Sequence, residues 1–437
     1  MPYKPVDALE VRLWNKRIGA VALDPATDYY AFQYDPKFLS SGVEPAPIAM
    51  PLSKGGAPHI FTRLPEETFY RLPAMLSDAL PDRFGNALID AWMIKNGVSA
   101  SSITPLDRLA YMGSRGMGAL TFHPNRGPAK AKSTGIQLAK LVEAARKTVH
   151  GELHADDVAE AALRQIISVG TSAGGARAKA VIAYHPGTRE VRSGQFDVPP
   201  GFEHWLLKFD GIRPDYKDLG PTETYGRIEY AYYLMAREAG IDMHPCDLLR
   251  ENGRAHFMTK RFDRGTGGIR HHMQSLGAMA SMDYKLVAVH SYHQLFDTLV
   301  QLKLPRTAMI EALRRMIFNV LAANNDDHPK NFSFLLREGA DWELAPAYDV
   351  THAYEPKSKW VSRHLMSVNG KFEGITHDDL RAVAERYDLL AEFKPVLSRV
   401  ESALARWPHF AAVAEVTEDQ ASKVKSVLAD LAALARK

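Results

Sequence analysis

The chain has 437 residues but a single cysteine, Cys246, so its cysteines can build neither a disulfide framework nor a zinc finger. One cysteine in a chain of this length is typical of a reducing compartment. No window approaches the roughly 18 uninterrupted apolar residues that a helix needs to span a bilayer. Residues 1–17 carry charges throughout and lack the apolar core of a signal peptide. We therefore expect a soluble, cytoplasmic protein.

A strong charge of one sign is also missing, as are internal repeats and low-complexity tails. The 54 lysine and arginine side chains nearly balance the 51 aspartate and glutamate side chains, which gives a formal net charge of +3. So small an excess does not by itself indicate nucleic acid or membrane binding, although it leaves a local basic patch open. The length corresponds to roughly three average domains and is ample for a large core.

The most informative stretch that is present is NNDDHPKNFSFLL, which begins at Asn324. Asp326 stands five positions before Asn331, and the later stretch LAPAYDVT supplies Asp349. In phosphoryl transfer from a metal nucleotide, one Asp orients the attacking hydroxyl and accepts its proton, while an Asn and a second Asp hold magnesium ions. These three residues match those roles. The DD pair alone is more typical of a helix cap or a turn, but Asn331 and Asp349 together favour the catalytic interpretation.

The surrounding residues predict how the three side chains converge. Apolar residues recur at helical spacing from Arg306 to Ala323, which predicts a helix with one buried face that ends in the loop carrying Asp326. After Asn331, FSFLL predicts a strand, REGAD a turn and WELAP a returning strand. Such a hairpin brings Asn331 beside Asp349. Magnesium favours this arrangement because it usually takes only one or two protein carboxylates, together with phosphate and water.

The order of elements along the chain predicts an α+β protein. The first ~120 residues are mixed, with a hairpin of EVRLW and AVALD and a helix over 77–95. The remaining segments are a linker over 124–135, amphipathic helices near 137–148 and 156–167, a strand-rich region over 169–262 with one helix over 223–239, and a mostly helical region from about 291. The closing helix begins with a capping-box pair, Thr417 and Gln420. A strand-rich block followed by a helical block is the order of a two-lobed kinase, with nucleotide in the cleft between the lobes.

Two segments of the strand-rich block are candidates for binding phosphate. Lys208 lies in the apolar stretch HWLLKFDG, where a buried lysine requires an anionic partner such as phosphate, although an edge-strand lysine that points at water is the simpler interpretation. In TSAGGARAKAVIAY, which begins at Thr171, Gly174 and Gly175 would let backbone N–H groups approach phosphate, and Arg177 and Lys179 add charge. This stretch matches neither of the common glycine-rich nucleotide motifs and is also compatible with an ordinary hairpin turn.

The stretch FMTKRFDR, residues 257–264, follows at the distance expected of a hinge between lobes. There the backbone of Lys260 and Phe262 would pair with adenine, while Arg261 and Arg264 would form structural ion pairs. Glu229, on the helix that follows Lys208, would orient that lysine.

Taken together, NNDDHPKNFSFLL, PAYDVT, KRFDR, HWLLKF, SAGGARAK, QSLG and MSVNGKFEGIT resemble the HipA family of bacterial serine/threonine kinases, the toxins of HipBA toxin–antitoxin modules. The likeness covers nearly the whole chain, including LPDRFGN and GSRGMGALTF near the N-terminus. It implies a protein-kinase-like fold with three regions: a small N-terminal subdomain over 1–125, a kinase N-lobe over 136–265, and a helical C-lobe over 266–437 with the catalytic loop and the metal site.

The resemblance also assigns roles to individual residues. Asp326 would be the catalytic base, and Asn331 and Asp349 the metal ligands. The remaining ATP contacts would come from the phosphate loop (Gly174, Gly175, Ala176, Arg177, Ala178, Lys179), from Lys208, from the hinge (Lys260, Arg261, Phe262) and from His328, Lys330, Asn331, Tyr348 and Asp349. The chain departs from the family at Lys260, where a glutamate is common, and at Arg177 and Ala178, where the pair is usually more polar.

Ser172 falls where HipA kinases phosphorylate themselves, which expels the loop and silences the enzyme. A phosphate there carries about −1.5 to −2 charges and would repel nucleotide phosphates. Thr171 is an alternative hydroxyl, and Ser172 as a plain turn residue is the structural alternative.

The resemblance implies a kinase that uses ATP and Mg²⁺, phosphorylates an aminoacyl-tRNA synthetase and is held inactive by HipB, a helix-turn-helix antitoxin that contacts DNA. Two alternatives are a small-molecule kinase of the same fold and a catalytically inert co-repressor partner.

Overall fold

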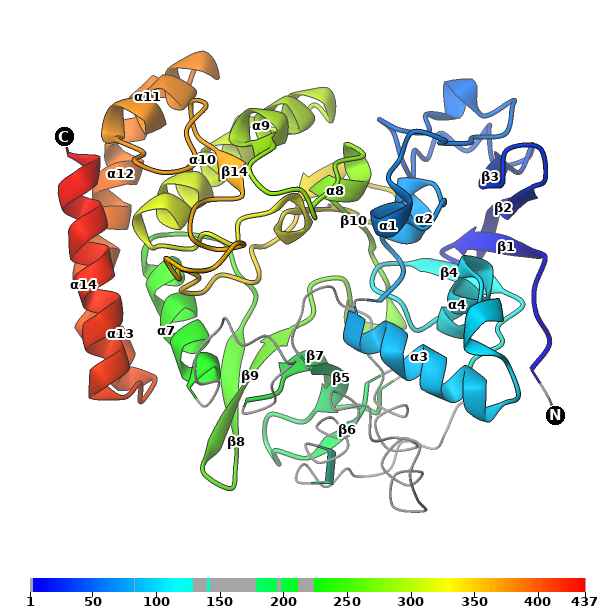
Figure 1. Cartoon of the computed structure of the whole chain (residues 1–437), viewed down its shortest axis with the longest axis horizontal. Helices are drawn as coiled ribbons and strands as arrows, with labels where there is room; N and C mark the ends of the chain where they lie inside the picture. The colour runs from blue at the N-terminus through cyan, green and yellow to red at the C-terminus, as the bar shows by residue number, and fades with distance from the viewer. Residues whose placement is uncertain are drawn as a thin grey trace.

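The structure is a computed structural model that describes residues 3–81, 83–128, 140–141, 178–194, 198–210 and 224–436. Most of the predicted linker, nearly all of the helices expected near 137–148 and 156–167, and residues 171–177 of the glycine-containing turn lie outside the described residues. The described residues form an α+β fold, as the sequence predicts. Figure 1 shows the N-terminal region on one side, the C-terminal helices on the other and a five-stranded sheet between and below them.

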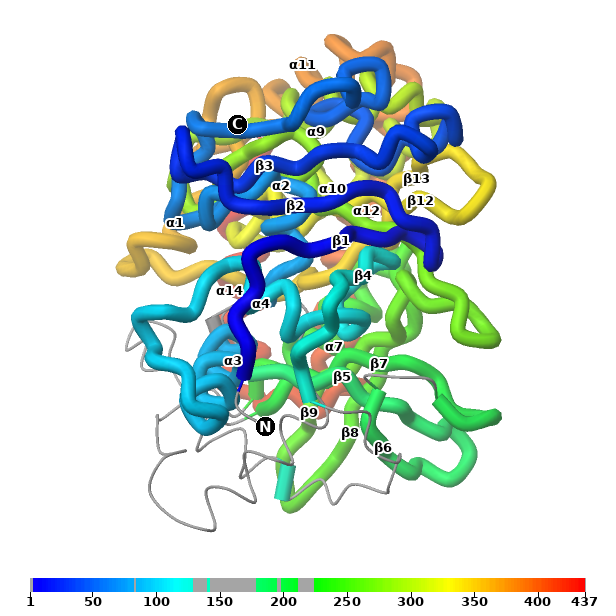
Figure 2. Tube along the Cα trace, turned by 90° about the vertical axis from the view of Figure 1, so that its right-hand side faces the viewer, coloured from blue at the N-terminus to red at the C-terminus, as the bar shows by residue number. Residues whose placement is uncertain are grey.

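The N-terminal region is built on a four-stranded antiparallel sheet with the strand order β3-β2-β1-β4 (Figure 2). Its elements are β1 (Ala8–Leu13), β2 (Lys16–Asp24), β3 (Tyr29–Tyr34), α1 (Glu66–Phe69), α2 (Ala74–Ser77), α3 (Arg83–Lys95), α4 (Pro105–Met112) and β4 (Leu120–His123). The hairpin predicted for the first two strands is confirmed, because β1 and β2 pair antiparallel around a turn in which Trp14 and Asn15 have positive φ. Alternate residues of β1 and β3 are buried, so one face of this sheet lies on the core.

The second sheet has five strands in the order β6-β5-β7-β9-β8. They are β5 (Lys179–Tyr184), β6 (Val191–Ser193), β7 (Glu203–Lys208), β8 (Cys246–Glu251) and β9 (Arg254–Lys260). The helix α7 (Tyr225–Glu238), predicted over 223–239, packs on β8 and β9, and α3 packs through Phe84 and Leu88 on the apolar cluster that β5 and β7 contribute. A Cβ on Gly226 would lie 2.2 Å from the carbonyl oxygen of Ala255, so this glycine allows α7 to approach the sheet closely.

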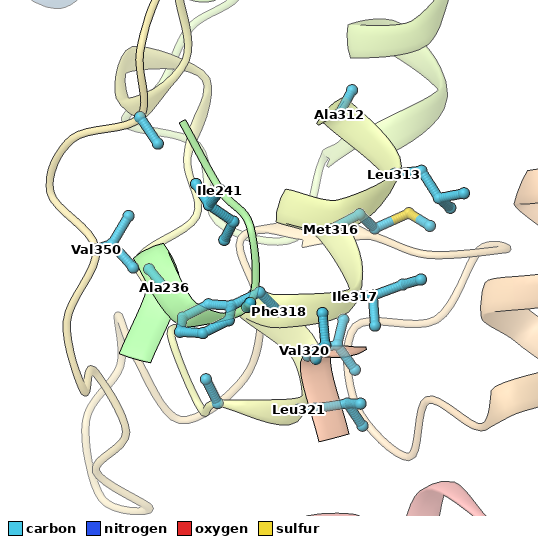
Figure 3. Close-up of a cluster of buried hydrophobic side chains, with 14 of the residues drawn as sticks. Ala236, Ile241, Ala312, Leu313, Met316, Ile317, Phe318, Val320, Leu321 and Val350 are labelled. Atoms are coloured by element: carbon cyan, nitrogen blue, oxygen red, sulfur yellow. The ribbon is translucent and has the colours of Figure 1, made fainter. Parts of the chain in front are cut away.

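The C-terminal region is mostly helical and is centred on α10. Its helices are α8 (Leu276–Met279), α9 (Tyr292–Gln301), α10 (Arg306–Leu321), α11 (His377–Arg386), α12 (Leu390–Ala405), α13 (Trp407–Val413) and α14 (Glu418–Ala435), and its strands are β10 (His272–Ser275), β11 (His290–Ser291), β12 (Ser333–Leu336), β13 (Trp342–Leu344) and β14 (Met366–Ser367). Figure 3 shows Leu313, Met316 and Ile317 of α10 among the buried side chains of this core. The predicted helix over 306–323 is thereby confirmed.

The predicted hairpin after Asn331 is also confirmed, because β12 and β13 pair antiparallel with Phe334 opposite Leu344. The predicted capping box of the last helix is wrong. Thr417 is the N-cap residue of α14 but makes no side-chain cap hydrogen bond. The side chain of Gln420 instead accepts a hydrogen bond from the hydroxyl of Thr224, so a tertiary partner replaces the local one.

Two partly buried arginines, Arg264 and Arg270, join the N-terminal region to the segment that follows β9. The turn GSRGMG connects α4 with β4, and Arg264 and Arg270 donate hydrogen bonds to its backbone carbonyls at Gly116 and Gly118. The carboxylate of Asp263 pairs with Arg264 at 2.7 Å and accepts a hydrogen bond from the N–H of Gly118 at 2.7 Å. The surrounding guanidinium groups outweigh burial and hold the pKa of Asp263 below its ordinary value.

A buried histidine at the same boundary predicts a pH dependence of stability. His272 is fully buried, and its Nε2 donates to the carbonyl of Pro45 at 2.9 Å, while its Nδ1 has no partner among the described residues. Burial lowers the pKa of His272 to about 4. Between about pH 6.5 and 4 the unfolded chain therefore binds a proton at this residue that the folded chain does not.

The free energy of unfolding should therefore decrease as the pH is lowered from about 6.5 to 4, by about 1.4 kcal/mol per pH unit for such a group. Urea unfolding at pH 7 and pH 5 measures this slope. In His272→Gln, whose side-chain amide keeps a donor for Pro45, we expect a shallower slope, and an unchanged slope would contradict the assignment.

Candidate active site

The loop that carries Asp326 is fixed by hydrogen bonds from both directions. It begins two residues after the end of α10, at Ala323, whose φ of 53° turns the chain away from the helix. The N–H of Asn325 donates to the carbonyl of Ala353 at 3.2 Å, and the side-chain amide of Asn331 donates to the carbonyl of Asp326 at 2.7 Å. The spacing of five residues between Asp326 and Asn331 thus closes the loop, and it leaves the side-chain oxygen of Asn331 as a candidate metal ligand.

The two adjacent aspartates of this loop have different surroundings. Asp327 is 1% exposed, and its carboxylate accepts hydrogen bonds from Tyr292 (2.8 Å), His364 (2.9 Å) and the backbone N–H of Leu365 (2.8 Å). Asp326 keeps 38% of its side chain exposed. Asp327 therefore holds the loop in place, while Asp326 remains accessible to a reacting group.

The carboxylate of Asp326 has two polar neighbours. The indole N–H of Trp360 donates to its Oδ1 at 2.6 Å, and Nε2 of His328 lies 3.7 Å from the same oxygen. Nδ1 of His328 accepts a hydrogen bond from the N–H of Lys330, which orients the ring. Burial raises the pKa of Asp326 above its ordinary value, although His328 and Trp360 act to lower it. A carboxylate with a raised pKa is a better proton acceptor near neutral pH.

Lys208 lies between two carboxylates at the end of β7. Its ammonium group contacts Oε1 of Glu229, on α7, and Oδ1 of Asp349, after β13. The side chains of Lys208 and Glu229 are 10% and 2% exposed, so this is a buried ion pair and not the water-facing edge lysine of the simpler interpretation. Burial alone would lower the pKa of Lys208, but the two carboxylates outweigh it and raise the pKa above its ordinary value.

A second lysine stands directly opposite on the neighbouring strand. Lys179 of β5 pairs with Lys208 of β7 and is 2% exposed. Two like charges opposite each other destabilise an antiparallel pair unless anions compensate them. Burial acts to raise the pKa of Asp349, but Lys208 and Lys179 outweigh it and lower the pKa to about 2. Two cations therefore converge on an ionised carboxylate, which is an arrangement suited to bind a metal-bound polyphosphate.

The two ends of the β12–β13 hairpin meet beside this carboxylate. The hydroxyl of Tyr348 donates to the carbonyl of Lys330 at 2.7 Å and contacts the hydroxyl of Ser333. Asp349 itself has a φ of 56°, in the left-handed region, which aspartate adopts more readily than most other residues do. The hairpin thus brings the residues around Asn331 next to those around Asp349.

The donor set suits magnesium and not a metal held by protein alone. Among the described residues no group of three or more His, Cys, Asp or Glu side chains can hold a metal ion. Asn331 and Asp349 offer one amide oxygen and one carboxylate, and magnesium commonly takes one or two carboxylates and completes its shell with phosphates and water. The ionised state of Asp349 suits a ligand of this kind.

The residues of the predicted hinge make more hydrogen bonds and ion pairs within the protein than the sequence suggests. The N–H of Lys260 donates to the carbonyl of Pro245 at 2.8 Å, so a backbone contact from Lys260 to adenine is left to its carbonyl oxygen. Its side chain pairs with Glu203 at 2.6 Å. The predicted structural ion pairs of Arg261 and Arg264 are confirmed, because both guanidinium groups contact Asp263 at 2.7 Å. The guanidinium group of Arg261 thus makes an ion pair within the protein.

The rings of Phe262 and Tyr348 lie 5.6 Å apart between centroids and form an apolar cluster with Leu335 and Ala345. Leu335 and Ala345 are fully buried and Phe262 nearly so, and the cluster lies at the predicted hinge. Of the predicted phosphate loop, Lys179 is the first residue of β5 and Ala178 directly precedes it, whereas Gly174, Gly175, Ala176 and Arg177 lie outside the described residues, as do Thr171 and Ser172.

Trp360 and Tyr284 are site residues that sequence reasoning missed. Trp360 lies eleven positions after Asp349 in an irregular segment, and Tyr284 lies between α8 and β11. No periodicity or motif marks either residue. Only the folded chain brings their rings to His328, at centroid distances of 6.1 Å for Trp360 and 5.6 Å for Tyr284.

Sequence models of one family match both parts of the chain. The model described as HipA N-terminal domain matches residues 9–123, and the model described as HipA-like C-terminal domain matches residues 171–434. The second match alone covers more than half of the 437 residues. Among the described residues, no helix has both the length and the apolar character to cross a membrane.

Known proteins that are similar to the chain include a bacterial relative and a chain of a solved complex. A relative from Sinorhizobium fredii (strain NBRC 101917 / NGR234), named "Putative kinase Y4mE", is 29% identical over 153 residues, which make up 32% of this chain and 36% of that protein. The match thus spans about a third of the relative's length. A chain of a solved complex from Shewanella oneidensis MR-1, described as a toxin–antitoxin system of HipA, HipB and its operator DNA, has a TM-score of 0.66 at 18% identity and covers 98% of this chain and 96% of that one. This likeness shows the fold, and the predicted α+β, kinase-like, two-lobed class is confirmed.

Proposed function

Because the chain belongs to the HipA family, we propose that it is an ATP- and magnesium-dependent protein serine/threonine kinase that acts in the cytoplasm. The observation that carries the proposal is the pairing of a half-exposed Asp326, held by Trp360, with the buried Lys208–Glu229–Asp349 cluster. One group is placed to accept a proton and the other to hold phosphate and metal. The three regions 1–125, 136–265 and 266–437 are the proposed functional units.

Each residue has a stated task in this proposal. Lys208, oriented by Glu229, binds phosphate oxygens together with Lys179, and the aromatic cluster of Phe262 holds adenine beside Lys260 and Arg261. Asn331 and Asp349 hold Mg²⁺, which neutralises phosphate charge when it is bound. Asp326 orients the acceptor hydroxyl and takes its proton. Tyr348, His328 and Lys330 keep the two loops together.

The regulation and partners that we propose follow the family. Ser172, or its neighbour Thr171, is phosphorylated by the kinase itself, which blocks the phosphate loop through charge repulsion. The protein substrate is a component of translation such as an aminoacyl-tRNA synthetase. The described Shewanella complex contains HipA, HipB and operator DNA, and we extend this association to a HipB-like helix-turn-helix antitoxin for the present chain.

The proposal is tested by calorimetric titration of ATP with and without Mg²⁺ and by transfer of labelled γ-phosphate to protein. Labelling of a synthetase band in lysate supports the proposal, and a phosphorylated metabolite without labelled protein indicates a small-molecule kinase. Absence of ATP binding would leave the inert co-repressor as the better interpretation.

Replacement of Asp349 by Asn should weaken the binding of Mg·ATP more than that of free ATP. The amide keeps the shape but loses the charge that pairs with the cation. The loss of one charge-assisted contact is worth roughly 1.5–3 kcal/mol, or about ten- to a hundredfold in affinity. Comparison of the dissociation constants of both proteins with and without Mg²⁺ measures the effect. If the ratio of the two dissociation constants is the same in both proteins, Asp349 is not a metal ligand.

A further inference from the structure

The segment that follows Asp349 crosses back over the catalytic loop and is fastened to it at several points. Ala353 exchanges backbone hydrogen bonds with Ala323 and Asn325. Further along, the side-chain amide of Asn325 donates to the carbonyl of Val361 at 3.2 Å, and the N–H of Leu365 donates to the carboxylate of Asp327 at 2.8 Å. The residues between these anchors, 354–363, are therefore held against the catalytic loop.

Within this segment, Trp360 reaches the carboxylate of Asp326 directly. Its indole N–H donates a hydrogen bond to Oδ1 at 2.6 Å. The ring of Trp360 contacts the ring of His328, which in turn contacts the ring of Tyr284. We call these three side chains the aromatic row. Nζ of Lys330 lies 5.0 Å from the centre of the Tyr284 ring, so a positive charge lies beside the last ring of the aromatic row. Through the contact of Trp360, this row lies next to the carboxylate of Asp326.

The exposed charged side chains around Trp360 are basic. Lys357, Lys359 and Arg363 are all exposed, and residues 354–363 contain a single carboxylate, Glu355. Three cations against one anion give this segment a net charge of +2, almost as large as the +3 of the whole chain. An excess of positive charge on the segment that carries Trp360 attracts negatively charged partners and steers their approach.

We propose that residues 354–363, with the aromatic row, form the acceptor-binding surface of this site, and that it selects a serine or threonine in an acidic stretch of protein. The inference rests on the proposed kinase function and adds its substrate class. In it Trp360 is a positioning residue, which holds one oxygen of Asp326 and leaves the other for the acceptor hydroxyl. Three cations suit a short acidic peptide better than a nucleic acid, because proteins that bind duplexes make roughly six to ten phosphate contacts.

Peptide binding tests the charge of this surface apart from catalysis. Two labelled peptides are compared by fluorescence anisotropy with the full chain, one with aspartates and one with lysines around a central alanine in place of serine. We expect the acidic peptide to bind at least about tenfold more tightly, and this preference to be lost in Lys357→Glu/Lys359→Glu. The matched control is Lys423→Glu/Lys425→Glu on α14, a pair of exposed lysines with the same spacing, which should keep the preference.

Equal binding of both peptides, or the same loss in the control pair, would overturn the proposal. Tighter binding of single-stranded polyuridylate than of the acidic peptide, lost in Lys357→Glu/Lys359→Glu, would also overturn it and assign the surface to nucleic acid. If peptide preference depends on Lys357 and Lys359 while wild type transfers no phosphate to the serine peptide, the kinase function fails and the acidic-peptide surface stands without it.

The role of Trp360 is tested with two substitutions on the serine-containing acidic peptide. Trp360→Phe keeps a ring but removes the N–H, so kcat should fall by about tenfold while KM for the peptide changes little. Trp360→Ala also removes the ring and should raise KM as well. Equal losses in both variants with a changed affinity for ATP would indicate a merely structural role and would contradict the positioning of Asp326.

Discussion

Replacement of Asp326 by Asn is expected to slow phosphoryl transfer by roughly 10²–10⁴-fold while the affinity for ATP stays near that of the wild type. The amide can still accept the hydrogen bond from Trp360, so the loop keeps its anchor, but it cannot take a proton from a hydroxyl. Because the Asp326 side chain is 38% exposed, its loss of charge should change the free energy of unfolding little. Transfer of labelled phosphate and denaturant unfolding measure the two effects.

The neighbouring residue provides the matched control. Asp327→Asn places an amide N–H₂ where the native carboxylate accepts hydrogen bonds from Tyr292, His364 and two backbone N–H groups. Buried donors would then face each other, and we expect a loss of roughly 2–4 kcal/mol in the free energy of unfolding. If instead Asp327→Asn is stable and inactive while Asp326→Asn is active, the two aspartates have been assigned in the wrong order.

The second large effect is expected at Lys208. Lys208→Met removes the cation between two carboxylates and leaves Glu229, with a side chain 2% exposed, as a buried charge without that partner. Removal of one member of a buried ion pair typically costs about 3–5 kcal/mol. Guanidinium unfolding measures the loss, and titration with ATP should show binding weakened beyond detection because the phosphate contact is gone as well.

A double-mutant cycle separates charge pairing from packing at Lys208. Glu229→Gln in the Lys208→Met background removes the stranded charge, so the double variant should be more stable than the sum of the single losses predicts. Simple additivity would mean that Lys208 contributes by packing alone.

The pH dependence of the Lys208→Met deficit supplies a further check. The folded-state pKa of Asp349, about 2, lies below its unfolded value near 3.9. The stability that Asp349 contributes to the wild type is therefore present above about pH 4 and is lost as the pH falls toward 2. The difference between wild type and Lys208→Met should narrow over this interval.

The sequence predicted the elements that depend on local pattern. The helix ahead of Asp326 and the hairpin after Asn331 follow from apolar spacing and turn residues, and both are confirmed. The contact of Glu229 with Lys208 could be anticipated because α7 follows β7 and returns to pack on the same sheet. Each of these features is determined within a few dozen residues of chain.

Features that depend on distant chain were missed or misjudged. The partner of Gln420 is Thr224, nearly two hundred positions earlier, and no local pattern distinguishes this contact from a capping box. Trp360 reaches Asp326 only because Asn325 and Asp327 anchor its segment. The backbone N–H of Lys260 donates a hydrogen bond to the carbonyl of Pro245, and the sequence of the hinge alone does not reveal this contact.

The partly buried arginines that follow the hinge have a practical consequence for work on this protein. Arg264 and Arg270 satisfy their guanidinium groups with carbonyls of residues 114–120, so the two regions share one set of hydrogen bonds. A fragment that begins after β4 would lack these acceptors, so Arg264 would keep the carboxylate of Asp263 but lose its carbonyl partners, and the loss of hydrogen bonds to charged groups is costly. Truncation to the catalytic half should therefore yield insoluble material, and enzymology on this protein calls for the undivided polypeptide.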